Sequence, residues 1–259
     1  MLREYPIKRF DINKWVEKVD VVAEEAEFTL FVNGEEFASF LCTPADQINL
    51  GLGYLVSEGI IQKQTDVLLI NFQEMEHYVD IRLEPSIKVI NKNEVKKVLT
   101  SGCGKGSIFL KSLREINLLS SSPVLEIHSS FIYSLMQKFQ KMSELFLQTG
   151  GVHSVGLCTP AEILFHKEDI GRHNAVDKIL GECLSQNLVT SDKILLLSGR
   201  MATEIVQKAG RAGIQILLSK SAPTSMAIDM ANKIGMTLVG FVRGERMNVY
   251  SHPKRIISS

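Results

Sequence analysis

Short apolar runs alternate with amphipathic segments in the last third of the chain. Residues 193–197, 214–218 and 237–242 are dominated by apolar side chains, a pattern typical of strands that are buried on both faces. Between these runs, residues 201–212 and 224–234 have the spacing of helices. This order predicts two βαβ units, and right-handed crossovers place their three strands side by side and parallel.

The preceding segments predict two further helices and a hairpin. Residues 152–157 and 161–166 are expected to pair as strands. The next helix places its apolar side chains on one face: Ala175, Val176, Ile179, Leu180 and Cys183. Upstream, one long amphipathic helix is predicted to end near Gly150-Gly151, with apolar residues at three- and four-residue steps: Phe131, Leu135, Phe139, Met142 and Phe146. The whole region predicts a three-layer α/β domain.

The first part of the chain predicts a smaller α+β domain. Residues 28–42 form a hairpin around Asn33-Gly34, because these two residues tolerate the positive φ of a tight turn. A helix follows, with Thr43 as its N-cap and Pro44 at its first position. Two more strands are expected at residues 67–72 and 78–83.

Polar loops follow the predicted strands of the α/β domain. They comprise residues 168–173, 198–200, 219–224 and 241–246. In an α/β sheet such loops converge on one edge, where ligands bind. Over the whole chain, 29 basic residues balance 29 acidic residues. The loops nevertheless gather five of the cations: Arg172, Arg200, Lys220, Arg243 and Arg246. We therefore expect a pocket for an anion.

Several side chains in these loops suit a phosphate-bearing ligand. Hydroxyls at Ser198, Ser221 and Thr224, together with backbone N–H groups, suit phosphate oxygens. The last loop consists of Phe241, Val242, Arg243, Gly244, Glu245 and Arg246. Its aromatic ring, Phe241, suits stacking on a base, and its two guanidiniums, Arg243 and Arg246, suit binding to phosphate. Each of these also has a plain alternative, since Ser and Thr often cap helices and a strand often ends in a solvated turn.

Two histidines accompany these loops. His173 falls at the start of a helix, where it acts as an acid or base or donates a hydrogen bond to a ligand. The alternative is that Asp169 or Asn174 caps this helix while Arg172 pairs with an acid. His153 lies beside Gly150-Gly151 and is either a further site residue or a structural histidine of its strand.

Cys103 is the sharpest candidate for chemistry. It lies between two glycines in a glycine-rich segment, residues 91–107, that predicts a mobile loop or linker. Lys105 favours the thiolate, the form that attacks or carries sulfur. The alternative is an incidental cysteine in a flexible loop. We expect the other cysteines, which lie in or beside apolar elements, to belong to the core: Cys42, Cys158 and Cys183.

Composition and missing motifs exclude several classes. The balanced charge predicts no nucleic-acid partner, and neither a secretory signal nor a run of about 20 apolar residues is present, so we expect no membrane span. Scattered cysteines fit the reducing cytoplasm. The chain has no phosphate loop of the G-x-x-x-x-G-K-[ST] type. It has no C-x-x-C, and the glutamate of the zinc-deaminase H-x-E is missing both at His153-Ser154-Val155 and at His173-Asn174-Ala175, so we expect no metal of its own.

Taken together, the motifs are similar to those of one family. The chain resembles the FdhD family, sulfur carrier proteins required for formate dehydrogenase activity, over nearly everything from Phe28 to Ile256. The matching segments are residues 32–34, 55–61, 149–153, 168–178, 198–200, 222–224, 238–241 and 249–253.

The resemblance implies a fold and a role. The fold is a cytidine-deaminase-like three-layer α/β domain (residues 108–259) with a smaller N-terminal α+β domain (residues 1–100), joined by a carrier loop (residues 101–107), often as a homodimer. The role is to take sulfur from a cysteine desulfurase as a persulfide on Cys103. The sulfur then passes to the molybdenum cofactor, bis-molybdopterin guanine dinucleotide, before the cofactor enters formate dehydrogenase. Residues 241–246 match the segment that contacts the guanine dinucleotide.

One residue departs from the family pattern. Many members carry C-x-x-C in the carrier loop, whereas this chain has Gly106 at the second position. A mechanism that needs a disulfide within the loop is therefore excluded, although a single persulfide suffices for relay. The departure favours a second hypothesis, a cofactor-binding chaperone for formate dehydrogenase that carries no sulfur. A third hypothesis, a metal-dependent deaminase, predicts bound zinc.

Overall fold

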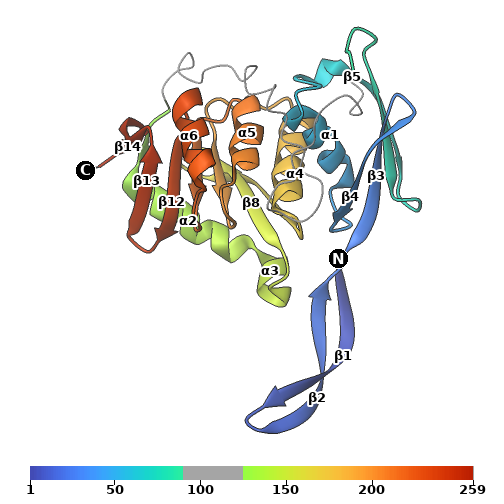
Figure 1. The fold of residues 1–259 in the computed structure, drawn as a ribbon, viewed down its shortest axis with the longest axis vertical. Helices are drawn as coiled ribbons and strands as arrows, with labels where there is room; N and C mark the ends of the chain where they lie inside the picture. Colours follow the sequence, from blue (N-terminus) through green and yellow to red (C-terminus); the bar gives the residue numbers. More distant parts are fainter. Residues whose placement is uncertain (90–124, 259) are drawn as a thin grey trace.

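The computed structural model describes residues 1–89 and 125–258 (Figure 1). Residues 91–107, with the predicted carrier loop and Cys103, lie outside the described residues. The predicted domain boundaries fall in the same stretch and remain predictions. Within the described residues, no helix combines the length and apolar character needed to cross a membrane.

A six-stranded sheet with the order β13-β12-β11-β10-β8-β9 organises the C-terminal part. Strands β10, β11 and β12 are parallel neighbours, which confirms the two βαβ units. Strand β8 runs antiparallel to both β10 and β9, so β9 points in the same direction as the three parallel strands. The strands are β8 (His153–Cys158), β9 (Ile163–Asp169), β10 (Ile194–Leu197), β11 (Ile216–Ser219), β12 (Thr237–Arg243) and β13 (Arg246–Ser251).

Helices cover both faces of this sheet, which confirms the three layers (Figure 1). Leu195 and Leu217 point to the face covered by three helices, and Leu196 and Leu218 point to the face covered by α2. Because successive residues of a strand point to opposite faces, both sets are buried and the strands read as continuously apolar. The helices are α2 (Ser129–Met142), α4 (Arg172–Ser185), α5 (Thr203–Arg211) and α6 (Ser225–Ile234).

The predicted long helix before this sheet is wrong, because it is broken at Ser143. Helix α2 ends at Met142, and a separate short helix, α3 (Glu144–Thr149), follows. The backbone N–H groups of Leu145 and Phe146 donate to the Glu168 carboxylate, each at 3.0 Å. This carboxylate satisfies N–H groups that a continuous helix would have used internally. Of the predicted apolar face only two residues are buried, while three are exposed: Phe131, Met142 and Phe146.

The N-terminal part contains a four-stranded sheet with the order β4-β3-β6-β5, and helix α1 (Gln47–Ser57) packs against it. The predicted hairpin at residues 28–42 is confirmed, with positive φ at Asn33 and Gly34. The other two predicted strands are confirmed as well. The strands are β3 (Ala26–Val32), β4 (Glu35–Cys42), β5 (Val67–Gln73) and β6 (Tyr78–Leu83), with a 3-10 turn at Gln64–Asp66 before β5.

Further elements near both ends of the chain have no counterpart in the sequence prediction. Strands β1 (Leu2–Asp11) and β2 (Lys14–Ala23) form a hairpin that projects from the body (Figure 1). Its turn residues, Ile12 and Asn13, both have positive φ. Near the C-terminus, a 3-10 turn at Pro253–Arg255 leads to β14 (Ile256–Ile257), which pairs in parallel with β7 (Ile127–His128).

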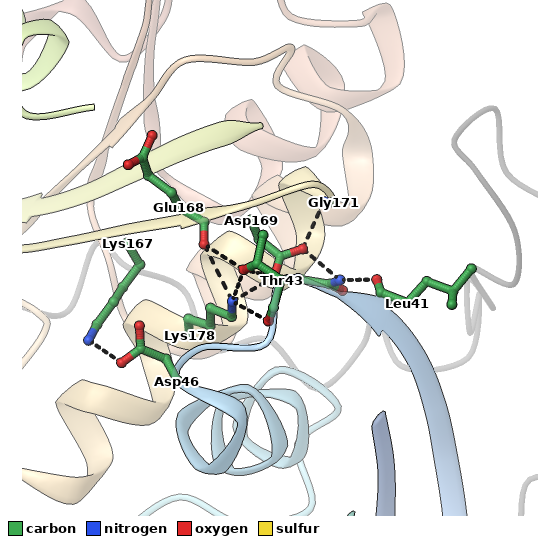
Figure 2. A network of polar contacts seen from close by, with 9 residues as sticks. Leu41, Thr43, Asp46, Lys167, Glu168, Asp169, Gly171 and Lys178 are labelled. Carbon is green, nitrogen blue, oxygen red and sulfur yellow. Dashed lines mark hydrogen bonds and ion pairs between the residues drawn. The ribbon is translucent and has the colours of Figure 1, made fainter. Parts of the chain in front are cut away.

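Thr43 is not the N-cap that the sequence predicts. Helix α1 starts later, at Gln47, and its N-cap residue is Asp46. The Thr43 backbone N–H and hydroxyl each donate to Oδ2 of Asp169 at 3.1 Å, and the hydroxyl accepts from Nζ of Lys178 at 2.7 Å (Figure 2). Thr43 thus satisfies buried groups of the other part of the chain, which competes with capping its own helix.

Helices α1 and α4 approach so closely that two glycines are required. A Cβ atom at Gly53 would lie 1.7 Å from the backbone oxygen of Asp177. A Cβ atom at Gly181 would lie 1.9 Å from the backbone oxygen of Asn49. Neither gap holds even a methyl group, so the two backbones lie in direct contact. This contact joins the N-terminal sheet to the α/β domain.

We expect Gly53→Ala to lower the free energy of unfolding by about 3 kcal/mol, since the methyl group must push backbone away from backbone. Gly51→Ala, in the same helix, is the matched control. Its Cβ would meet only the ends of side chains: Val79, Leu30 and Ile81 at 3.1, 3.3 and 3.6 Å. Both changes bring the same gain in helix propensity. Urea unfolding of the two variants gives the comparison, and equal stabilities would contradict the close contact.

Candidate functional site

The predicted polar loops do lie at one edge of the sheet. Strands β9, β10, β11 and β12 run in the same direction, so the loops that follow them meet at the same edge. Strands β8 and β13 begin there. From β9 to β12 the edge spans four strand spacings, roughly 19 Å at about 4.8 Å each. The site is therefore a row of groups that suits an elongated ligand.

At one end of the row, His153, Arg172 and the loop after β10 come together. A Cβ at Gly199 would lie 3.2 Å from Nδ1 of His153 and 3.8 Å from Cβ of Arg172. Burial lowers the pKa of His153, and the positive charges of Arg172 and Arg200 lower it further. His153 is thus neutral near pH 7 and offers hydrogen bonds within a cationic surrounding.

His173 is also a neutral imidazole. Burial, followed by the positive charges of Lys208 and Arg172, lowers its pKa to about 3. Its Nε2 lies 3.3 Å from Oε2 of Glu204, so the neutral ring places its proton on Nε2 toward this carboxylate. Of the two predicted roles, a hydrogen-bonding role fits this environment better than acid–base chemistry near pH 7.

Glu204 is a site residue that the sequence reasoning missed. It lies in the first turn of α5, just after the loop at residues 198–200. Its only sequence signal is an acidic residue in the first helical turn, which is common in helices of every kind. The tertiary structure alone places its carboxylate next to His173.

Two buried polar atoms in this group have no hydrogen-bond partner among the described residues: Nε of Arg172 and Oε1 of Glu204. No ion pair between Arg172 and an acid is found within residues 1–89 and 125–258, so the alternative in which Arg172 pairs with an acid has no support there. Buried donors and acceptors are costly when unsatisfied, so these atoms suit a ligand that supplies their partners.

In the middle of the row, hydroxyl groups tie the loops together. The Ser198 hydroxyl accepts from the Ser154 N–H at 2.9 Å. The Ser219 hydroxyl donates to the Gly199 carbonyl at 2.7 Å and accepts from the Ser221 N–H at 3.0 Å. Thr224 precedes α6 as its N-cap residue without forming a side-chain cap bond. These bonds fix the positions of loop backbones.

At the far end, residues 241–246 form the turn between β12 and β13. Phe241 and Gly244 both have positive φ. The Arg243 guanidinium lies 5.6 Å from the centre of the Phe241 ring, and its Nε donates to the Lys220 carbonyl at 3.4 Å. The exposed Lys220 ammonium donates in turn to Gln140 of α2 at 3.2 Å.

Two open pockets flank this turn. One of about 270 Å³ is lined by Phe241, Arg243, Arg246 and Asn248. The other, of about 470 Å³, lies between the turn and α2, and Gly244 and Glu245 are among its lining residues. Val242 also lines this second pocket, although most of its side chain is buried in the core under α2. The aromatic ring and the two guanidiniums thus do share a pocket, as the sequence predicts.

A comparison with protein families decides the assignment. The model described as the FdhD/NarQ family matches residues 23–257. The chain belongs to the FdhD/NarQ family. A sulfur carrier protein FdhD of Bacillus pumilus is 40% identical over 240 residues, which cover 92% of this chain and 91% of that protein. The protein of the same name from Listeria monocytogenes is 38% identical over 252 residues, covering 96% and 97% of the two chains.

The fold has a counterpart among solved structures. The crystal structure of a proposed formate dehydrogenase accessory protein from Desulfotalea psychrophila superposes with a TM-score of 0.79. It covers 99% of both chains at 24% sequence identity. This FdhD/NarQ chain therefore has the same overall fold as that protein.

The described cysteines of this FdhD/NarQ protein are core residues, as predicted: Cys42, Cys158 and Cys183. Burial raises the pKa of each to about 12. They are thiols rather than thiolates near pH 7, so they are inert toward sulfur transfer. In residues 1–89 and 125–258, no three His, Cys, Asp or Glu side chains are grouped to hold a metal ion.

Residues 168–178, which match the family pattern, include side chains that stabilise the contact between the N-terminal part and the α/β domain. The Asp169 carboxylate, fully buried, lies 2.6 Å from Nζ of the equally buried Lys178. Its other oxygen accepts from the Gly171 N–H at 2.8 Å and from the Asn174 amide at 3.0 Å (Figure 2). Asp169 and Asn174 thus brace the loop that leads into α4, whose N-cap residue is Gly171.

We expect Asp169→Asn to destabilise the protein by about 3–5 kcal/mol, because the Lys178 ammonium is left buried without its counter-charge. The control is the double variant Asp169→Asn/Lys178→Met, which removes both charges. It should recover most of the lost free energy of unfolding, measured from urea midpoints. A double variant no more stable than the single one would contradict this explanation.

We expect His173 to make stability depend on pH. The unfolded chain takes up a proton on this residue below about pH 6.5, whereas the folded protein does so only near pH 3. Stability is therefore fully present above about pH 6.5 and declines as the pH falls toward 3, by about 3 kcal/mol at pH 4. His173→Gln should lack this part of the decline in pH-dependent urea unfolding.

The matched control is His77→Asn, at an exposed turn position with positive φ that asparagine tolerates. It should keep the wild-type pH dependence. An unchanged slope in His173→Gln would show that His173 is not held neutral.

Proposed function

We propose that this protein is a sulfur carrier for formate dehydrogenase. It accepts sulfur from a cysteine desulfurase as a persulfide on Cys103 and transfers it to bis-molybdopterin guanine dinucleotide before this cofactor enters the dehydrogenase. The observation that carries the proposal is the row of cationic and hydrogen-bonding groups along one sheet edge in a member of the FdhD/NarQ family. The names of the relatives support the same role.

The cofactor is cargo in this proposal, and the two ends of the row bind different parts of it. Phe241 stacks on the guanine, and Arg243 and Arg246 pair with phosphate, because all three line one pocket. Further along the edge, cations, hydroxyls and neutral imidazoles hold the remaining phosphates and polar groups: Arg172, Arg200, Lys220, Ser198, Ser221, Thr224, His153 and His173. A row of roughly 19 Å supports a dinucleotide better than a single phosphate ion.

The sulfur step uses a thiolate. The Cys103 thiolate attacks the outer sulfur of the desulfurase persulfide, a sulfur–sulfur bond forms on Cys103, and the desulfurase cysteine leaves as thiolate. The acceptor later removes the outer sulfur and returns the Cys103 thiolate. The high pKa values of the three described cysteines support Cys103 for this role by elimination.

Other parts of the proposal come from the family resemblance. The helix layers on both faces of one six-stranded sheet support a cytidine-deaminase-like domain. The buried free cysteines support a reducing compartment, the cytoplasm. We also propose a homodimer as the working form.

A second candidate is a cofactor-binding chaperone that carries no sulfur. The observation that favours it is Gly106, which stands where many family members have a second loop cysteine. This candidate requires the basic edge but does not require Cys103.

We expect Cys103→Ala to abolish maturation of formate dehydrogenase while the fold and guanine-nucleotide binding remain. Ser107→Ala, in the same segment but without a thiol, is the matched control and should retain activity. Incubation with a cysteine desulfurase and cysteine should add about 32 Da, one sulfur atom, to Cys103 in the wild type. Peptide mass spectrometry measures this gain. Full activity of Cys103→Ala without any mass gain in the wild type would establish the chaperone instead.

A further inference from the structure

The hairpin of β1 and β2, here called the arm, has one apolar face that nothing in the described chain covers. Paired residues of antiparallel strands share a face, and the pairs Leu2–Ala23, Pro6–Val19 and Phe10–Trp15 all lie on this one. At the tip, the Phe10 and Trp15 rings lie 5.0 Å apart and are 58% and 68% exposed. The opposite face carries charged residues such as Arg3, Arg9 and Lys18.

Such an arm does not stand alone in water. A two-stranded hairpin is marginally stable without further packing. Within the described residues the base of the arm contacts the body, where a Cβ at Gly151 would lie 3.6 Å from Cβ of Ala23. Ala23 belongs to the apolar face, so this face starts beside α3 and continues outward to the tip. An exposed apolar strip of this kind marks an interaction surface.

The body carries a second apolar strip that the described residues leave uncovered, along α2 and α3. Its exposed residues are Phe131, Met142, Phe146 and Leu147. The two helices have 14 and 6 residues, about 30 Å of combined length. The arm's ten-residue strands are about 33 Å long, which matches it.

The charges between the apolar groups are complementary. The strip has exposed Lys138 and Lys141 between Phe131 and Met142, and one exposed acid, Glu144, at the start of α3. The apolar face of the arm has exposed Glu4 and Glu17, with only Lys8 as a cation. Acidic groups on the arm thus match basic groups on the helices.

We propose that two copies of this chain exchange arms, the apolar face of each lying along α2 and α3 of the other. This inference rests on the proposed homodimer and names its interface. An arm face of about 33 by 10 Å covers about 300 Å² on each side of a contact, so two reciprocal contacts bury about 1,200 Å² in total. That is the lower limit for a stable complex, whereas one arm against the other arm buries only about half as much.

The first test is the oligomeric state of the full chain by sedimentation. The wild type should be a dimer, and Phe10→Glu/Trp15→Glu should raise its dissociation constant at least about 30-fold, since central aromatic contacts dominate interfaces. Arg9→Glu/Lys18→Glu, on the opposite face of the arm, is the control and should remain dimeric. A monomeric wild type would overturn the homodimer itself, whereas a dimer unaffected by the tip variant would overturn only the arm exchange.

The second test locates the arm on the partner. In a Cys103→Ser background, a Trp15→Cys chain is mixed with a tagged Met142→Cys chain and oxidised. A mixed disulfide is expected, while a chain with Val189→Cys, an exposed position between α4 and β10, should form none. A disulfide between two Trp15→Cys chains in place of the mixed one would overturn the exchange in favour of arm-on-arm contact. Equal yields of mixed disulfide with the Met142→Cys chain and with the Val189→Cys chain would also overturn the arm exchange.

Discussion

The contact between α1 and α4 is the constraint on which the rest of the structure depends. Their backbones touch at Gly53 and Gly181, where no side chain fits. Beside this contact, Thr43 and Lys178 surround the Asp169 carboxylate, so the apolar joint also contains a fully satisfied charge. A second buried pair, Lys208 and Asp177 at 2.7 Å, links α5 to the same joint. Buried charges of this kind tolerate only one arrangement of the helices, because any shift leaves one unpaired.

The contact between α1 and α4 also fixes the positions of residues in the candidate site. Helix α4 carries the joint along its length and Arg172 and His173 in its first turn. The loop before it is held by Asp169 through Gly171 and Asn174. Binding groups that are supported by buried bonds lose little freedom when a ligand arrives, which favours affinity. The strongly family-like segment 168–178 therefore serves both the joint and the site.

The site and the proposed sulfur chemistry lie on different parts of the chain. The sheet edge offers neutral imidazoles and guanidiniums, groups that bind without reacting. The described cysteines are buried thiols. In our proposal the edge holds the cofactor while Cys103 brings the sulfur, which separates binding from transfer.

The sequence by itself determined the α/β domain and its functional edge. Runs such as residues 193–197 place apolar side chains on both faces, a pattern that a strand covered on both faces satisfies. The order of the strands, their parallel direction and the edge at which their loops lie followed from that pattern. Tertiary structure decided what local signals could not. The predicted long helix is broken at Ser143 because the Glu168 carboxylate, distant in sequence, caps the start of α3. Thr43 does not cap α1 because its hydroxyl donates instead to the buried Asp169 carboxylate. Glu204 joins the site, and the arm takes shape, through contacts and exposures that no local pattern encodes.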